Sequence, residues 1–244
     1  MAMLGVIGGT GLDRWGGLEN EIKGETPYGS ASAPVAVYTA GATQILFVSR
    51  HGLGHTIPPH RVNYRANLFA LHQAGVREVI AINAVGGIGS DCGPGVVVLP
   101  DQLIDYTWGR EQSFSDDAET NLQHVEFAEP FSGALRQRLI DTARAHQIPL
   151  TESGCVGVVQ GPRLETSAEI RRLARDGCDL VGMTTMPEAA LARELGMDYA
   201  CVAMVANWAA GMSEEPITMA AIERVLAATT RQVRGLIAAL CEAT

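Results

Sequence analysis

Residues 180–207, LVGMTTMPEAALARELGMDYACVAMVAN, contain the pattern from which the fold class is predicted. Its two ends, residues 180–183 and 199–207, are apolar runs that predict strands buried on both faces. Between them lies PEAALARELG, with a proline suited to the first turn of a helix and a glycine suited to its end. A buried strand, a polar connection, a helix and another strand predict an α/β protein.

The rest of the chain repeats this alternation. A capping box from Thr166 to Glu169 predicts the start of a further helix, which stops at a glycine. Amphipathic patterns predict other helices over residues 62–70, 133–147 and 222–237. Apolar runs predict strands at residues 4–8, 44–49, 78–83, 95–100 and 154–161. With no linker and no repeat, we expect one domain over residues 1–244, with a central mixed, largely parallel sheet flanked by helices.

The composition argues against several kinds of partner. Hydrophobic residues make up 47% and charged residues 18%, and the formal net charge is −9 without any strongly basic cluster, so we expect no nucleic-acid partner. Net charge does not decide the local potential, and a pocket for a small anion stays open.

Cysteine usage and the N-terminus predict the compartment. The five cysteines include no CxxC pair, which argues against a disulfide framework and a zinc site and favours a reducing environment. The first residues predict a strand and not a signal peptide, and no run reaches the ~18 apolar residues of a membrane span. We therefore expect a cytoplasmic protein without a membrane partner.

Polar groups that suit an anion follow four of the predicted strands. Each alone has a plainer explanation, namely a tight turn, a surface pair or a helix cap. In α/β proteins, however, ligands bind at the carboxyl ends of strands, where these groups would converge. Together they predict one site for inorganic phosphate or a phosphate ester. Its predicted residues are Thr10, Arg50, His51, Asn83, Ala84 and Thr184.

These residues belong to longer motifs that carry a family resemblance. The segments GVIGGTGL, RHG, PPHRVNYRANL, INAVGG, QGPRLET, GMTTMPEAALARELG and YACVAMVAN occur in this order. Over almost its whole length the chain resembles the trimeric purine nucleoside phosphorylase and methylthioadenosine phosphorylase family. The resemblance implies the nucleoside phosphorylase fold and a homotrimer or a dimer of trimers. It also implies phosphorolysis of a purine nucleoside, with the phosphate residues named above holding a phosphate co-substrate, and neither a metal nor an organic cofactor.

Two positions matched to the family's base site predict the catalytic residues. By the resemblance, members that cleave 6-oxopurines have Glu and Asn where this chain has Glu165 and Asn207. Members that cleave 6-aminopurines have aspartates at the positions of Asn207 and Ala209. A Glu165 carboxylate can accept N1–H of a 6-oxopurine, and Asn207 can donate to the oxo group and accept from a protonated N7. Adenine's bare N1 would stay unpaired, which disfavours 6-aminopurines. The plainer explanations are a helix-start carboxylate and a turn residue.

Other positions are assigned to the substrate by the same resemblance. Met183 is expected under the ribose, Leu164 against the purine, and Ala209 and Trp208 near the base, although Trp208 could also only pack. His124 matches a family residue that reaches the 5′ pocket of the neighbouring subunit.

The sugar end is predicted to be apolar. Family members that cleave 6-oxopurine ribonucleosides have a histidine near the 5′-hydroxyl, and this chain has Ile222 at the matched position. Met219 lies one helical turn away on the same face, so both residues could line a slot for a methylthio group. The alternative is that both are ordinary core residues.

An oxopurine base and an apolar 5′ pocket together predict S-methyl-5′-thioinosine as the substrate. The products would be hypoxanthine and 5-methylthioribose 1-phosphate, which is the reaction of the bacterial methylthioinosine phosphorylases within the family. Three alternatives stay open: a methylthioadenosine phosphorylase, a general inosine and guanosine phosphorylase, and a nucleoside-binding module without catalysis.

Overall fold

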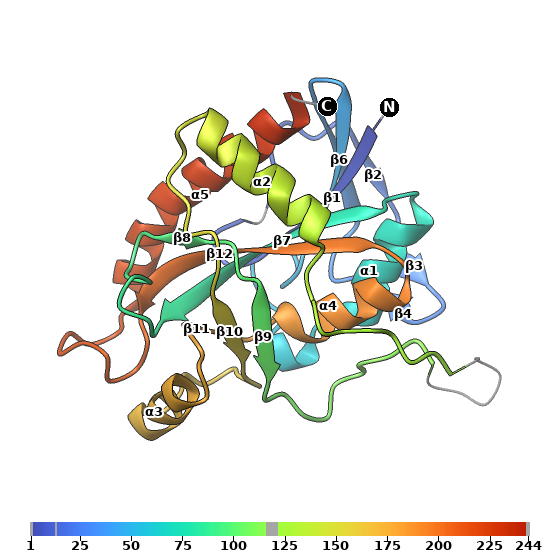
Figure 1. Ribbon diagram of the computed structural model, residues 1–244. Helices are drawn as coiled ribbons and strands as arrows, with labels where there is room; N and C mark the ends of the chain where they lie inside the picture. The colour runs from blue at the N-terminus through green and yellow to red at the C-terminus, as the bar shows by residue number, and fades with distance from the viewer. Residues whose placement is uncertain (1, 13, 116–121, 243–244) are drawn as a thin grey trace.

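The computed structural model describes residues 2–12, 14–115 and 122–242 and has a ten-stranded sheet at its centre, with helices on both faces (Figure 1). The strand order is β2-β5-β6-β1-β7-β11-β10-β9, with β12 beside β7 and β8 beside β12. The strands of this sheet are β1 (Ala2–Gly8), β2 (Asn20–Ile22), β5 (Val35–Ala40), β6 (Thr43–Ser49), β7 (Glu78–Gly87), β8 (Val97–Val98), β9 (Gln102–Asp105), β10 (Cys155–Val158), β11 (Leu180–Gly182) and β12 (Asp198–Trp208). A small separate hairpin consists of β3 (Glu25–Thr26) and β4 (Gly29–Ser30).

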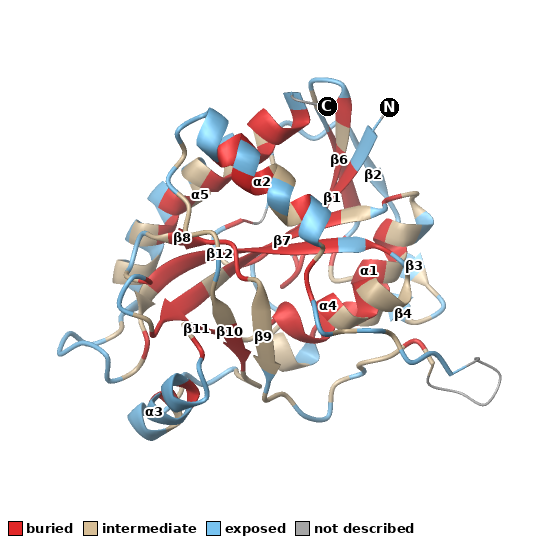
Figure 2. Cartoon of the chain, viewed as in Figure 1, coloured by how far each residue is buried: buried red, intermediate tan, exposed pale blue. Residues whose placement is uncertain are grey.

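Helices pack on the two faces of the sheet and create two cores. On one face lie α2 (Gly133–Ala145) and α5 (Met219–Glu242), and on the other lie α1 (Tyr64–Gln73) and α4 (Thr185–Glu194) (Figure 1). In β12 the odd-numbered residues 199–205 pack into the core with α1 and α4, and the even-numbered residues 200–206 pack into the core with α2 and α5. Both faces of this strand are therefore buried, which explains its continuous apolar run (Figure 2).

Two shorter helices complete the described chain. The 3-10 turn η1 (Pro59–Arg61) precedes α1, and α3 (Ser167–Arg175) lies at the lower edge of the molecule with most of its surface exposed (Figure 2). The predicted capping box of α3 is confirmed, because Thr166 accepts from the amide of Glu169 and the carboxylate of Glu169 accepts from the amide of Thr166.

Strand β7 organises the site, because two strands meet head-on along one of its edges. One edge of β7 pairs in parallel with β12 over its whole length. The other edge pairs in parallel with β1 up to Ile82 and antiparallel with β11 at Gly86 and Gly87. Since β1 and β11 run in opposite directions, their carboxyl ends face one another across residues 83–85. The connections that follow both strands therefore enter the same space.

A bulge in β12 adjusts the same region. Val205 pairs with Val85 and Asn207 pairs with Gly86, so Ala206 is the extra residue. A bulge turns neighbouring side chains toward one side of the strand. Ala206 and Asn207 accordingly both face the cavity described below.

Most of the predicted elements are confirmed, with two differences in the strands. The strand predicted over residues 95–100 shrinks to β8, which runs antiparallel to β12. Strands β2, β5 and β9, and the β3–β4 hairpin, have no counterpart in the sequence prediction. In α4 the regular helix begins at Pro187 as predicted, because Met186 before it has an extended backbone with φ −105° and ψ 136°. No helix in the described part of the chain is long and apolar enough to cross a membrane.

Candidate active site

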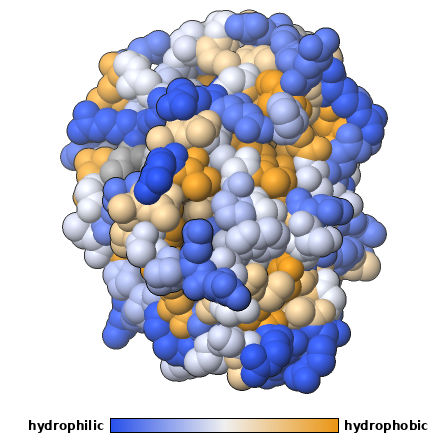
Figure 3. Space-filling model, turned by 90° about the vertical axis from the view of Figure 1, so that its left-hand side faces the viewer, coloured by the Kyte–Doolittle hydropathy of each residue, from blue (hydrophilic) through white to orange (hydrophobic). Residues whose placement is uncertain are grey.

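A cavity of about 570 Å³ lies where the carboxyl ends of β1, β6, β11 and β12 converge on β7. Figure 3 shows the side of the molecule toward which β7 and β12 run, where hydrophobic side chains interrupt a largely hydrophilic surface. Most of the residues predicted for the site line this cavity: Thr10, Arg50, His51, Ala84, Leu164, Glu165, Met183, Thr184, Asn207, Ala209, Met219 and Ile222. Residues that the sequence prediction drew from strands far apart in the chain therefore lie around one cavity.

Three predicted residues lie outside the lining. Asn83 is buried directly beneath the cavity and contacts residues that line it. The indole of Trp208 lies against Gly93, so Trp208 packs within the fold and does not face the cavity. His124 is exposed and does not line the cavity of its own chain.

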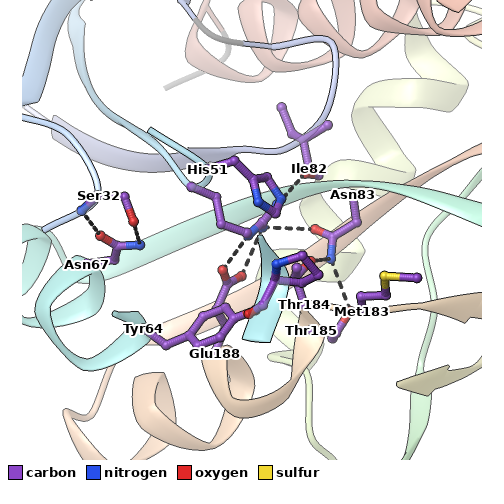
Figure 4. A network of polar contacts seen from close by, with 12 residues as sticks. Ser32, His51, Tyr64, Asn67, Ile82, Asn83, Met183, Thr184, Thr185 and Glu188 are labelled. Atoms are coloured by element: carbon purple, nitrogen blue, oxygen red, sulfur yellow. Dashed lines mark hydrogen bonds and ion pairs between the residues drawn. The ribbon is translucent and has the colours of Figure 1, made fainter. Parts of the chain in front are cut away.

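The guanidinium of Arg50, a predicted phosphate residue, is largely occupied by hydrogen bonds to protein groups. Its Nε donates to Glu188 Oε1 at 2.5 Å, and its Nη2 donates to Glu188 Oε2 at 3.0 Å and to Asn83 Oδ1 at 3.1 Å (Figure 4). Its Nη1 donates to the carbonyl of Ile82 at 3.0 Å. Burial lowers the pKa of Arg50, but the attraction of Glu188 outweighs burial and holds this pKa above its usual value. One N–H on Nη1 has no assigned partner among these bonds and stays available to a ligand.

The ring of His51 is oriented by a backbone carbonyl. Burial and the nearby charge of Arg50 lower the pKa of His51 to about 4, so the ring is neutral at pH 7. Nδ1 lies 2.8 Å from the carbonyl oxygen of Ile57, and because a carbonyl only accepts, Nδ1 carries the proton. Nε2 is therefore an acceptor. His51, one of the predicted phosphate residues, thus presents an acceptor, which suits a hydroxyl of phosphate or sugar.

Asn83 orients the hydroxyl of Thr184. Asn83 Nδ2 donates to Thr184 Oγ1 at 2.9 Å and to Thr185 Oγ1 at 3.1 Å, while its Oδ1 accepts from Arg50 (Figure 4). Because Thr184 Oγ1 already accepts a bond, its own proton is free to point into the cavity. Thr185 is fully buried and has Cys201 Sγ at 3.9 Å, so its hydroxyl belongs to the buried network and not to a helix cap.

Asn207 lies beside Gly86, three residues further along β7 than Asn83, and Glu165 lines the same cavity. Burial raises the pKa of Glu165 above its usual value. Asn207 Nδ2 donates to the carbonyl of Trp208 at 2.7 Å, which fixes the amide so that one N–H and Oδ1 remain for a base. Ala209 is buried beside them and Leu164 is half exposed.

The third part of the cavity is largely apolar. Met183, next to Thr184 in the chain, lines the cavity, and Met219 and Ile222 line it from the first turn of α5. Met219 is 62% exposed, so it lies at the mouth, whereas Ile222 packs partly into the core. Sequence reasoning missed Ile217, which lines the cavity from the loop before α5 and gives no signal of its own in the sequence.

Two polar residues outside the lining were also missed. Glu188 is fully buried, and the only hint in the sequence is a carboxylate in the first turn of a helix that is otherwise mostly apolar. Arg110 donates to the carbonyls of Met183, Met186, Val159 and Gln160, and so ties the segments after β10 and β11 together. In the described residues no group of three or more His, Cys, Asp or Glu side chains could hold a metal ion.

The fold and the cavity together define a class of protein. A model of the Phosphorylase superfamily matches residues 3–242, and the chain belongs to this superfamily. It is 53% identical over 222 residues to a probable S-methyl-5′-thioinosine phosphorylase of Xanthomonas campestris pv. campestris, which covers 90% of this chain and 89% of that one. It is 46% identical over 246 residues to a probable S-methyl-5′-thioinosine phosphorylase of Pseudomonas syringae pv. tomato, with both chains fully covered.

Solved structures agree with this assignment. The methylthioadenosine phosphorylase of Schistosoma mansoni in complex with adenine superimposes with a TM-score of 0.95 at 32% identity, covering 99% of this chain and 91% of that one. The predicted family and fold class are thereby confirmed. So is the enzyme class, a nucleoside phosphorylase that transfers a pentosyl group, and enzymes of this family use phosphate as co-substrate.

Proposed function

We propose that the chain catalyses phosphorolysis of S-methyl-5′-thioinosine to hypoxanthine and 5-methylthioribose 1-phosphate. The observation that carries this proposal is that one cavity combines Glu165 and Asn207 at one end, Thr184 beside Arg50, and the apolar Ile217 and Ile222. Relatives that are 42–53% identical are named probable S-methyl-5′-thioinosine phosphorylases, which supports the same substrate.

The proposed reaction needs positioning and charge stabilisation. A phosphate oxygen forms a bond to C1′ while the bond from C1′ to N9 breaks, and the electron pair leaves with the purine. Thr10, Thr184 and the remaining N–H of Arg50 are proposed to hold the phosphate beneath the sugar. Asn83 and Ala84 belong to the same predicted phosphate site: the Asn83 side chain supports Thr184, and Ala84 lines the cavity.

Asn207 and Glu165 are proposed to stabilise the leaving base. The Asn207 amide keeps an acceptor for a proton on N7 and one donor for the oxo group. An ionised Glu165 accepts N1–H of hypoxanthine. Met183 is proposed to contact the ribose and Leu164 to pack on the purine, both from the cavity wall.

One observation favours a second candidate, S-methyl-5′-thioadenosine. The raised pKa of Glu165 means that its protonated form persists to higher pH than that of an exposed carboxyl. A protonated Glu165 can donate to the bare N1 of adenine. We expect activity on the adenine nucleoside, relative to the hypoxanthine one, to grow as pH falls.

We also propose a homotrimer or a dimer of trimers, in which His124 of one subunit completes the 5′ pocket of the next. The exposed position of His124 in its own chain is compatible with this role. Sedimentation gives the oligomeric state, and His124→Ala should weaken nucleoside binding without changing that state. A monomer with full activity would contradict the proposal. The single domain over residues 1–244 and the cytoplasmic location stay predictions.

The deciding experiment compares purine release from methylthioinosine, methylthioadenosine and inosine, each with and without phosphate. The proposal expects phosphate-dependent release with methylthioinosine as the best substrate. Equal rates on the two methylthio nucleosides would contradict the roles of Glu165 and Asn207. Equal rates on inosine and methylthioinosine would contradict the apolar 5′ pocket, and release without phosphate would contradict phosphorolysis.

A further inference from the structure

A buried ion pair of Arg50 and Glu188 lies beside the phosphate end of the cavity, and its carboxylate takes no direct part in the proposed reaction. Arg50 is 1% exposed and Glu188 is 0% exposed, and they come from positions 138 residues apart. Tyr199, also buried, donates its hydroxyl to Glu188 Oε2 at 2.8 Å. Arg50 lines the cavity and Glu188 does not, so the carboxylate acts on a ligand only through the arginine or through space.

The pair leaves the phosphate end with no net formal charge. Among the residues of the described chain that line the cavity, Arg50 has the one permanent positive charge. Thr10 and Thr184 offer neutral hydroxyls, and His51 is neutral at pH 7. The carboxylate of Glu188 compensates the charge of Arg50 through two hydrogen bonds. An arriving phosphate therefore meets donors and dipoles but no uncompensated cation.

Such compensation is unusual for a site that has only to bind an anion. Two N–H groups of Arg50 that could form a bidentate contact with phosphate are taken by Glu188 instead. The carboxylate also repels the phosphate directly, and in a buried site this repulsion is only weakly screened. Both effects lower the affinity for phosphate and for the sugar phosphate that forms in the same place.

We propose that Glu188 is a counter-charge that limits the affinity of the phosphate end of the cavity, so that phosphate enters and the sugar phosphate leaves readily. This inference rests on the proposed function, because it requires that phosphate binds beside Arg50. Glu188 is a tuning residue and not a catalytic one, since it touches neither phosphate nor nucleoside.

The sign of the effect separates this role from a purely structural one. Removing the charge in Glu188→Gln leaves Arg50 without its counter-ion, and phosphate then becomes that counter-ion. We expect Glu188→Gln to bind inorganic phosphate at least about tenfold more tightly than the wild type, because one repulsive unit charge is lost near the ligand. A merely structural carboxylate would give the opposite result, since a disturbed Arg50 would bind phosphate more weakly.

The binding experiment uses inorganic phosphate and the full-length protein. Isothermal titration gives the phosphate Kd of the wild type, Glu188→Gln and the matched control Tyr199→Phe, which disturbs the same cluster but keeps both charges. Tyr199→Phe should stay within about twofold of the wild type. Thr184→Val should weaken binding in both backgrounds, which shows that the ion occupies this cavity. Equal or weaker binding by folded Glu188→Gln overturns the inference, whereas no binding by the wild type overturns the proposed function instead.

Thermal unfolding covers the case in which Glu188→Gln folds poorly. A buried Arg50 without a partner costs stability, and phosphate should restore it by binding the native state. The phosphate-dependent rise in Tm should be larger for Glu188→Gln than for the wild type, with sodium chloride of equal ionic strength as the control. An equal or smaller rise contradicts the inference.

Steady-state kinetics adds a second readout. Tighter retention of the sugar phosphate predicts that Glu188→Gln lowers the KM for phosphate at least about fivefold and also lowers kcat, while the KM for the nucleoside changes less than about twofold. A joint rise in both KM values would indicate a general loss of structure and would contradict a specific charge effect.

Discussion

The approach of Arg50 to the end of β1 depends on the missing side chain of Gly9. A Cβ placed on Gly9 would lie 2.6 Å from the carbonyl oxygen of Ile82 and 2.7 Å from Arg50 Nη1. These two atoms are hydrogen-bonded to each other at 3.0 Å. Gly9→Ala must therefore move Arg50, or the strands, or both.

The size of the effect follows from those two contacts. Forcing a methyl group into a packed site costs roughly 1–3 kcal/mol. Losing a hydrogen bond from a charged donor costs about 1.5–3 kcal/mol. If the lost hydrogen bond of Arg50 weakens ligand binding by this amount, the KM for phosphate rises roughly 10- to 150-fold. If the cost of the added methyl group reduces the stability of the fold, Tm drops by roughly 2–12 °C, given about 2–4 °C per kcal/mol in a chain of this size.

The assay measures the KM for phosphate, the KM for the nucleoside and Tm in one set of proteins. Gly16→Ala is the matched control, because a Cβ there meets nothing within 4 Å. We expect Gly9→Ala to raise the KM for phosphate more than the KM for the nucleoside, and Gly16→Ala to leave both unchanged. Gly9→Ala with wild-type Tm and wild-type KM for phosphate would refute the close packing around Arg50.

Four further predictions concern the other parts of the cavity. Asn207→Asp combined with Ala209→Asp should shift preference toward 6-aminopurine nucleosides by roughly tenfold or more, measured as a ratio of kcat/KM values. Ile222→His should raise kcat/KM for inosine relative to methylthioinosine by roughly tenfold, because the 5′-hydroxyl gains a partner. Thr184→Val, which keeps the shape and removes the donor, should raise the KM for phosphate by roughly tenfold. The unfolded chain binds a proton at its usual pKa of 6.5, whereas folded His51 does so only near pH 4. Keeping His51 neutral therefore costs the folded state nothing above pH 6.5, but the free energy of unfolding decreases as pH falls from 6.5 toward 4, because the unfolded chain gains a proton there. His51→Gln should remove this part of the acid dependence of the free energy of unfolding.

Controls keep these outcomes interpretable. Thr185→Val should lower Tm without raising the KM for phosphate, because the Thr185 hydroxyl contacts Asn83 and not the cavity. An unchanged base preference in the double aspartate variant would mean that base choice lies elsewhere. An unchanged inosine ratio in Ile222→His would place the 5′ group away from α5. If His51→Gln showed the same slope between pH 4 and 6.5 as the wild type, the burial of His51 would not explain the acid dependence.

The sequence predicted the central sheet because both faces of its strands are buried and so read as apolar runs. It did not predict β5, whose outer residues Thr39 and Ala40 end an otherwise apolar run, or β2, whose three residues are all exposed. The formation of two- to four-residue strands such as β8 and β9 depends more on the strands beside them than on their own sequence. The head-on meeting of β1 and β11 is a property of the topology and has no local pattern.

Arg50 and Thr184 could be predicted to line one cavity because they follow strands, but their bonding could not be predicted. Arg50 looked open to a ligand, and only the fold shows that Glu188 takes its fork. The proton on His51 depends on the carbonyl of Ile57, whose position is set by the intervening loop. The indole of Trp208 packs against Gly93, and its position next to Asn207 in the sequence does not predict this contact.

Arg50 also closes the open edge of β7. Its Nη1 donates to the carbonyl of Ile82, where the pairing of β7 with β1 stops. One side chain therefore both faces the ligand and provides a hydrogen-bond partner for the edge of the strand. In a growing cell, substitutions of Arg50 are therefore expected to reduce the amount of protein as well as its turnover, since misfolded chains are degraded. A genetic complementation screen would score such alleles as nulls, and only an immunoblot beside the growth assay would separate missing enzyme from inactive enzyme.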